Sequence, residues 1–217
     1  MRSRLLSGSM VDIYVGESKR HWSLHRNLLC HHSTYFQSHL DDEPKKKGGK
    51  IELLDDDPSA FELLVKWLYQ GKIDDVSSMP VEKKWDYADA CQKLYVLCDK
   101  FNLPQLKNFA IDQFRKGCNE AGLVPGPEEI KPIYDTTPPD SPFRKLVSRI
   151  AARQIMDPES QSDAGSYKMC FEGNSDFAID VINAIKDGAG GKLFDDPTEE
   201  AGCTYHEHNN GQLCNGI

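Results

Sequence analysis

The stretch that decides the fold reads VDIYVGESKRHWSLHRNLLCHHSTYF at residues 11–36 and KIELLDDDPSAFELLVKWLYQGKI at residues 50–73. It opens with an alternation in which Val11, Ile13 and Val15 are separated by Asp and Tyr. Successive side chains of a strand point to opposite faces of a sheet, so this period of two places the three aliphatic residues on one face. A β-strand is therefore predicted at the start of the stretch.

The residues after this strand predict the second half of a hairpin and then two short helices. A polar break at residues 16–19 precedes Trp22 and Leu24, whose alternation with polar neighbours indicates a returning strand. Helical spacing of apolar residues follows, at Leu28, Leu29, Tyr35 and Phe36. Ser33 lies between the two pairs and is expected to cap the second helix.

The second stretch predicts one more strand and a third helix. Ile51 and Leu53 flank a glutamate as in a strand, and Asp57 followed by Pro58 is typical of a helix start. Gly71 is expected to end this helix. Its apolar stripe at i, i+3, i+4 and i+7 consists of Phe61, Leu64, Val65 and Leu68.

This order of elements, together with particular residues, resembles the BTB/POZ interaction domain. The matching positions are Asp12 in the first strand, His25-Arg26 before an apolar helix, Ser33-x-Tyr35-Phe36, and the helix ending Phe61…Leu68-Tyr69-x-Gly71. The resemblance implies an α+β fold in which a three-stranded sheet is covered by a cluster of helices. It also resembles the small fungal-type BTB proteins that carry a helical C-terminal appendix.

Two further helices fit the closing pair of such a domain. One carries Ala88, Cys91, Tyr95 and Cys98 on a single face, and the next begins near Pro104 with Leu106, Ala110 and Phe114 facing inward. The predicted BTB/POZ domain spans residues 10–118, after a flexible N-terminus at residues 1–9. That short N-terminus makes dimerisation by exchange of an N-terminal strand an unexpected arrangement.

The remainder of the chain divides by composition. Residues 119–142 are rich in proline and glycine and predict a linker. Residues 143–188 predict a helical appendix with one stripe of Phe143, Leu146, Val147 and Ile150 and a second of Phe177, Val181, Ile182 and Ile185. Residues 189–217 form an acidic tail that we expect to be mostly disordered.

Composition and charge limit the partners. The net charge is -8 and the sequence pI is about 5.4, which argues against direct binding to nucleic acid. No apolar run is long enough for a membrane helix or a secretory signal. Seven cysteines, several of them on apolar helical faces, favour reduced thiols. A cytoplasmic or nuclear protein is expected.

The resemblance implies a charged pocket near the centre of dimeric BTB proteins. The corresponding residues here are Asp12 and Arg26, with His25 beside them. The alternative is a purely structural ion pair in which Asp12 neutralises Arg26 or His25 at a strand end.

A candidate partner-binding surface lies on the predicted helix pair. Tyr35 and Phe36 are aromatic residues of the kind that anchor interfaces, although Phe36 also fits a core position. Leu40 and Asp42 have the hydrophobic-x-acid spacing that the resemblance associates with cullin binding in ubiquitin-ligase adaptors.

The tail contains the one candidate metal site, formed by Cys203, His206, His208 and Cys214. Two thiolates and two imidazoles match the ligand set of tetrahedral zinc. The spacing is not that of a standard zinc finger, and chance accumulation in a polar tail is the alternative. No other cofactor is implied, and no catalytic motif occurs, so an enzyme is not expected.

Three functions remain open at this point. The chain is a protein–protein interaction module that recruits substrates to a cullin-type ubiquitin ligase, a self-associating scaffold or transcriptional co-regulator without a ligase role, or a protein whose tail binds zinc for a separate binding role. The partners are accordingly other proteins, a cullin or a second copy of the chain.

Overall fold

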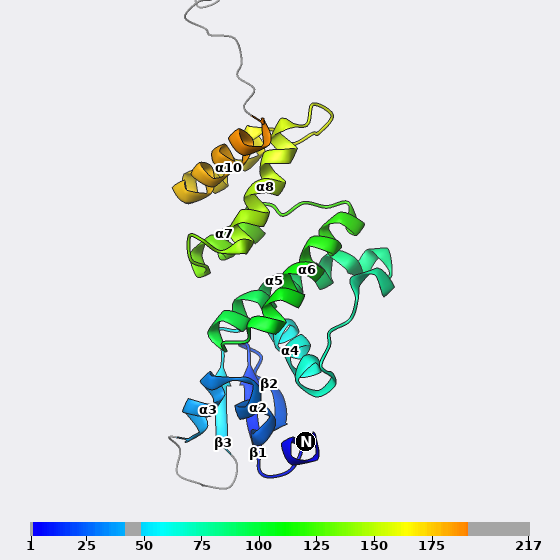
Figure 1. Cartoon of the computed structure of the whole chain (residues 1–217), viewed down its shortest axis with the longest axis vertical. Helices are drawn as coiled ribbons and strands as arrows, with labels where there is room; N and C mark the ends of the chain where they lie inside the picture. Colours follow the sequence, from blue (N-terminus) through cyan, green and yellow to red (C-terminus); the bar gives the residue numbers. More distant parts are fainter. Residues whose placement is uncertain (1, 42–48, 191–217) are drawn as a thin grey trace, which may run out of the picture.

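The computed structural model of the chain describes residues 2–41 and 49–190 (Figure 1). Within these residues one sheet of three strands is formed, with β1 (Met10–Val15) in the middle. β2 (Arg20–His25) pairs antiparallel with β1, and β3 (Gly49–Leu53) pairs parallel with it. The alternating residues Val11, Ile13 and Val15 are all buried, which confirms the predicted strand and its inner face.

Short helices cover the sheet and one longer helix closes the first half of the chain. They are α1 (Arg2–Leu5), α2 (Arg26–His32), α3 (Thr34–Asp41) and α4 (Pro58–Gln70). The Asp57 carboxylate accepts hydrogen bonds from the backbone N–H groups of Ser59 and Ala60 at 2.8 and 3.0 Å. Gly71 ends α4 with φ +76°, a conformation that a side chain disfavours. Both predicted ends of α4 are confirmed.

The N-terminal segment is more structured than composition suggested. Residues 2–5 form α1, and the Asn27 amide donates hydrogen bonds to the carbonyls of Arg4 and Ser7 at 3.3 and 2.6 Å. Leu5 packs against the core. The prediction of a flexible segment at residues 1–9 missed these contacts because they come from α2, which is distant in sequence.

The two closing helices are confirmed and are long. α5 (Val81–Lys100) follows the 3₁₀ turn η1 (Val76–Ser78), and α6 (Pro104–Ala121) packs along it. The predicted inward residues of both helices are buried. Gly117 permits close approach of the two axes, because a Cβ at this position would lie 2.8 Å from the Cβ of Ala88.

The segment predicted as a linker, residues 119–142, contains a helix. α7 (Pro127–Thr136) begins at a proline, which suits the first helical position, and buries Ile130, Ile133 and Tyr134. Pro132 lies inside α7. The proline removes the hydrogen bond that an N–H at this position would donate to the carbonyl of Glu128, and burial of the apolar face of α7 offsets this loss. Proline content alone therefore gave the wrong prediction for this part.

The C-terminal helices form the last structural group, seen at the top of Figure 1. They are α8 (Pro142–Met156), the 3₁₀ turn η2 (Ala164–Tyr167), α9 (Lys168–Gly173) and α10 (Ser175–Gly188). Ser141 and Asn174 cap α8 and α10 with their side chains. The tail beyond Gly190 lies outside the described residues.

The inner stripe of α10 is narrower than predicted. Phe177 and Val181 are buried, and Ile185 packs partly against the core. Ile182 is 65% exposed, so its prediction as a buried residue was wrong. It lies at the edge of the stripe, where the described helices do not cover it.

Phe143 joins the C-terminal helices to the first half of the chain. Its side chain is fully buried, with its ring centroid 4.6 Å from that of Tyr95 in α5 and 4.9 Å from that of Phe114 in α6. The Tyr95 hydroxyl lies 3.3 Å from the hydroxyl of Ser141, the cap of α8. The core is consequently continuous from the sheet to α10.

The neighbouring residue, Arg144, holds the C-terminal helices together. Its buried guanidinium donates hydrogen bonds to the carbonyls of Tyr134 and Thr137, at the end of α7, and lies 4.7 Å from the ring of Tyr134. One of its nitrogens is 3.5 Å from the carboxylate of Asp176 in α10. A buried charge is costly unless it is paired and hydrogen-bonded, and these contacts meet that requirement.

We expect Phe143→Ala to lower the free energy of unfolding by about 3–5 kcal/mol, because it leaves a cavity between α5, α6 and α8. Phe109→Ala is the matched control, since Phe109 in α6 is 47% exposed and its loss should change stability by about 0.5 kcal/mol. Urea unfolding followed by circular dichroism measures both. Equal effects of the two substitutions would contradict the joining role of Phe143.

Candidate interaction surfaces

α3 presents a ring pair at the edge of the first half of the chain. The half-buried Tyr35 stacks on the exposed His39 one turn later, with ring centroids 4.0 Å apart. The Tyr35 ring also packs on Phe101, with the two ring centroids 5.0 Å apart. Because Phe101 holds the Tyr35 ring in place, the exposed part of Tyr35 and the ring of His39 form a preorganised surface, which we call the α3 surface.

Two of the residues predicted to contact a partner are buried beneath this surface. Phe36 is 1% exposed and packs on Phe101, and Leu40 is 2% exposed. Their side chains support α3 and are not available to a partner. Phe36 therefore follows the core interpretation, and Asp42 lies outside the described residues. The sequence offered a signal for this, because Phe36 and Leu40 are one turn apart on an apolar stripe.

The predicted charged pocket is divided among different contacts. The Asp12 carboxylate contacts His21, whose Nε2 lies 2.9 Å from Oδ1 of Asp12. His25 Nδ1 lies 2.8 Å from the hydroxyl of Tyr69, in α4. The Arg26 guanidinium donates a 2.6 Å hydrogen bond to the carbonyl of Leu40, at the end of α3.

The structural alternative paired Asp12 with Arg26 or His25, whereas the contact that the structure shows is with His21. Asp12 faces Ser23 across the hairpin, and Tyr14 faces His21. His21 can reach back to Asp12 because the two residues are diagonal neighbours on the outer face of the sheet. The pairing depends on the hairpin register, which adjacency in sequence does not reveal.

A polar and aromatic cluster surrounds this ion pair on the outer face of the sheet. The ring of Tyr14 stacks on that of His21 with centroids 4.8 Å apart, and Lys50 Nζ lies 4.9 Å from the Tyr14 centroid. Lys50 also pairs with Glu52 at 2.7 Å. All these groups are solvent-accessible, so the cluster contributes recognition features more than stability.

Burial lowers the reactivity of three cysteine thiols. Burial raises the pKa of Cys91 and of Cys118 to about 12, and it also raises the pKa of Cys98. A thiol with such a pKa stays protonated and is a poor nucleophile or metal ligand. These residues act as small apolar groups in the core.

No group of three or more metal-binding side chains occurs in the part of the chain that the structure describes. The candidate zinc ligands of the tail, Cys203, His206, His208 and Cys214, lie outside that part and stay a prediction from sequence. Among residues 2–41 and 49–190, none of the helices has both the length and the apolar composition needed to cross a bilayer.

The Asp12–His21 pair has a testable pH dependence. The side-chain hydrogen bond from His21 lowers the pKa of the Asp12 carboxyl from its ordinary value of 3.8, with a smaller contribution from Ser23. The folded state thus binds this proton less tightly than the unfolded chain. The pair therefore stabilises the fold above pH 3.8, and this contribution is lost as the pH falls through the lowered pKa.

We expect His21→Ala to raise the pKa of Asp12 toward its ordinary value, as followed by carboxyl-carbon NMR titration. Asp163 is an internal control, because its lowered pKa arises from hydrogen bonds with Ser166 and should not change. An Asp12 pKa that is the same in the wild type and the variant would refute the assignment of His21 as its main partner.

Comparison with known proteins agrees with this architecture. A search of curated proteins finds no match. A scan against protein families matches residues 2–116, slightly more than half of the chain, to the BTB/POZ domain. BTB domains are protein–protein interaction and oligomerisation modules and are generally not enzymes. The hairpin, the parallel third strand, the helix pair and α5 fall within the matched residues, and α6 runs past them to Ala121. The chain therefore belongs to the BTB/POZ domain family.

Proposed function

We propose that the protein is an adaptor that binds a cullin-type ubiquitin-ligase scaffold through its BTB domain and a target protein through its C-terminal helices. The observation that carries this proposal is the docking of α8 on α5 and α6 through Phe143. An adaptor must hold two partners in a fixed relation, and a continuous core supplies that rigidity.

The α3 surface is the proposed cullin contact. The half-buried Tyr35 stacks on the exposed His39. Gln37 and Ser38 beside them are also exposed. Small interfaces are dominated by a few residues, aromatic ones above all, that are held in place before binding. Phe36 and Leu40 would act indirectly in this proposal, by fixing α3 on the core.

A cytoplasmic or nuclear location is part of the same proposal. It is supported by the thiols of Cys91, Cys98 and Cys118, which are free in the structure and would stay reduced in those compartments.

We expect His39→Glu to weaken cullin binding by roughly tenfold, because it adds a charge and removes the ring that stacks on Tyr35. Asn119→Glu makes the same change in charge at the exposed C-terminal end of α6, far from α3, and should leave binding intact (Figure 1). Affinity purification of the tagged full-length chain from its own cells, with mass spectrometry, measures both. Failure of the wild-type protein to recover any cullin would overturn the adaptor role.

Self-association without a ligase role is the second candidate, and one observation favours it. Leu6 and Met10, which follow α1, are 48% and 38% exposed. Leu6 also lines a groove of about 190 Å³ together with Leu28 of α2 and Trp67 of α4. Exposed apolar residues beside an apolar groove are typical of an interface between protein chains.

For this candidate, sedimentation velocity should give a mass above the 24.5 kDa monomer that increases with concentration. Leu6→Glu should restore the monomer, because a buried unpaired carboxylate is costly in an interface. Leu123→Glu is the matched control, since Leu123 is also 48% exposed but follows α6. A wild-type mass of one chain at all concentrations would eliminate self-association.

A further inference from the structure

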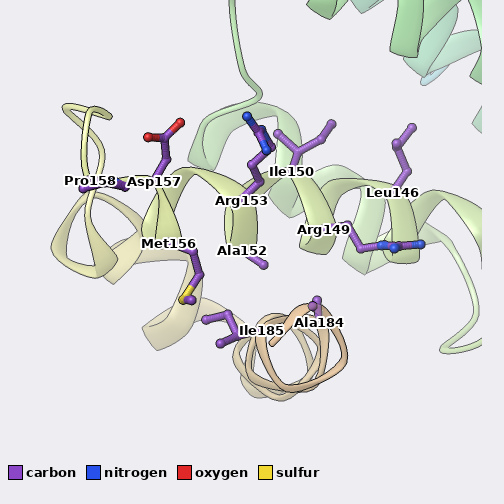
Figure 2. Close-up of a pocket in the computed structure, with 11 residues that line it drawn as sticks. Leu146, Arg149, Ile150, Ala152, Arg153, Met156, Asp157, Pro158, Ala184 and Ile185 are labelled. Carbon is purple, nitrogen blue, oxygen red and sulfur yellow. The ribbon is translucent and has the colours of Figure 1, made fainter. Parts of the chain in front are cut away.

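A groove of about 720 Å³ lies between α8 and α10 and is not part of the matched BTB domain (Figure 2). Its apolar lining comes from both helices. Ala152 and Met156 of α8 point toward α10, where Met156 lies next to Ile185, whereas Leu146, Ile150 and Arg153 point to the other side of α8 (Figure 2). The apolar residues are Leu146, Ile150, Ala152, Met156, Ala184 and Ile185.

The groove is apolar enough to favour an occupant. Met156 is 56% exposed, although it lies beside the half-buried Ile185. Covering the apolar lining with another apolar segment is favourable, because it removes apolar surface from water.

Two arginines give the groove a positive charge. Arg149 and Arg153 are one helical turn apart in α8 and both are exposed. Neither forms an ion pair with any carboxylate among the described residues. The acid in the lining, Asp157, accepts a 3.0 Å hydrogen bond from the backbone N–H of Glu159. The groove therefore suits a segment that carries apolar residues next to acidic ones.

The chain itself contains such a segment at the right distance. Gly188, the last residue of α10, lines the groove. The sequence continues to Leu193-Phe194-Asp195-Asp196, two apolar residues followed by two acids. Ala189 is still helical, so the free part of the chain begins at Gly190, the last described residue, and the four steps from Gly190 to Phe194 can span about 14 Å when extended. The part of α8 from Leu146 to Met156 is about 15 Å long, a comparable distance.

We propose that residues 193–196 occupy this groove in the same molecule. Leu193 and Phe194 cover Met156 and Ile185, and the carboxylates of Asp195 and Asp196 meet the guanidinium groups of Arg153 and Arg149. A thioether against an aromatic ring is a favourable contact, which suits Phe194 on Met156. This contact does not depend on cullin binding.

Methionine-methyl NMR of the full-length chain tests the contact directly. An aromatic ring over Met156 shifts its methyl signal, so Phe194→Leu should move the Met156 signal while keeping the segment apolar. Met169 is the internal control, because it is 72% exposed in α9 and does not line the groove, and its signal should stay in place. An unchanged Met156 signal in Phe194→Leu would overturn the proposal.

Charge reversal tests the second half of the contact. The double variant R149E/R153E should move the Met156 signal in the same direction as Phe194→Leu, because repulsion expels the segment. Adding D195R/D196R should restore the wild-type position, since the charges again attract. Lack of this rescue would contradict the ion pairs. A Met156 shift that grows with protein concentration would also overturn the proposal, because it would indicate the tail of a second copy.

Discussion

The placement of one aromatic side chain, Phe143, between Tyr95 and Phe114 determines how the two halves of this protein are related. The ring is fully buried and its neighbours belong to the two closing helices of the BTB domain. Without this contact, α8 would have no large apolar anchor on α5 and α6. Arg144 follows immediately and links α8 to α7 and α10, and α7 also contacts α5 directly, where the Gln92 amide donates a hydrogen bond to the carbonyl of Glu129.

Phe143 and Arg144, both buried, contribute to the packing of the C-terminal helices in different ways. Burial of Phe143 supplies free energy by removing apolar surface from water. Arg144 adds geometric precision, because its planar group can be satisfied only when the carbonyls of Tyr134 and Thr137 are correctly placed. The folded core thus extends past the family match at residue 116 into the C-terminal helices.

This continuity places the two proposed binding surfaces on one folded core. The α3 surface lies on the BTB domain, and the groove between α8 and α10 lies at the far end (Figure 1). In the first the half-buried Tyr35 packs on the buried Phe101, and in the second the exposed Met156 lies beside the half-buried Ile185. Rigid support of this kind lowers the entropy that binding must overcome.

Much of the fold could be predicted from local patterns. The alternation of Val11, Ile13 and Val15 and the Asp57 cap are decided by residues within a few positions of each other, so the sequence reveals them directly. α7 could not be predicted from proline content, because its stability comes from burying Ile130 and Ile133 against helices distant in sequence.

The candidate site was harder to predict than the fold, for the same reason. The partner of Asp12 depends on hairpin register, and Phe36 is covered by Phe101, which is more than sixty residues away in the sequence. Residue type indicated which side chains have binding chemistry. Only the packing shows which of them reach the surface.

Native-state hydrogen exchange at increasing urea concentration tests most directly whether residues 2–190 are one folded unit. We predict that amides of α8 and α10 lose protection at the same urea concentration as those of α5 and α6, because all four helices share the core around Phe143. Loss of protection in α7–α10 at clearly lower urea, while α5 and α6 stay protected, would show a separately unfolding appendix and contradict this structure of the protein.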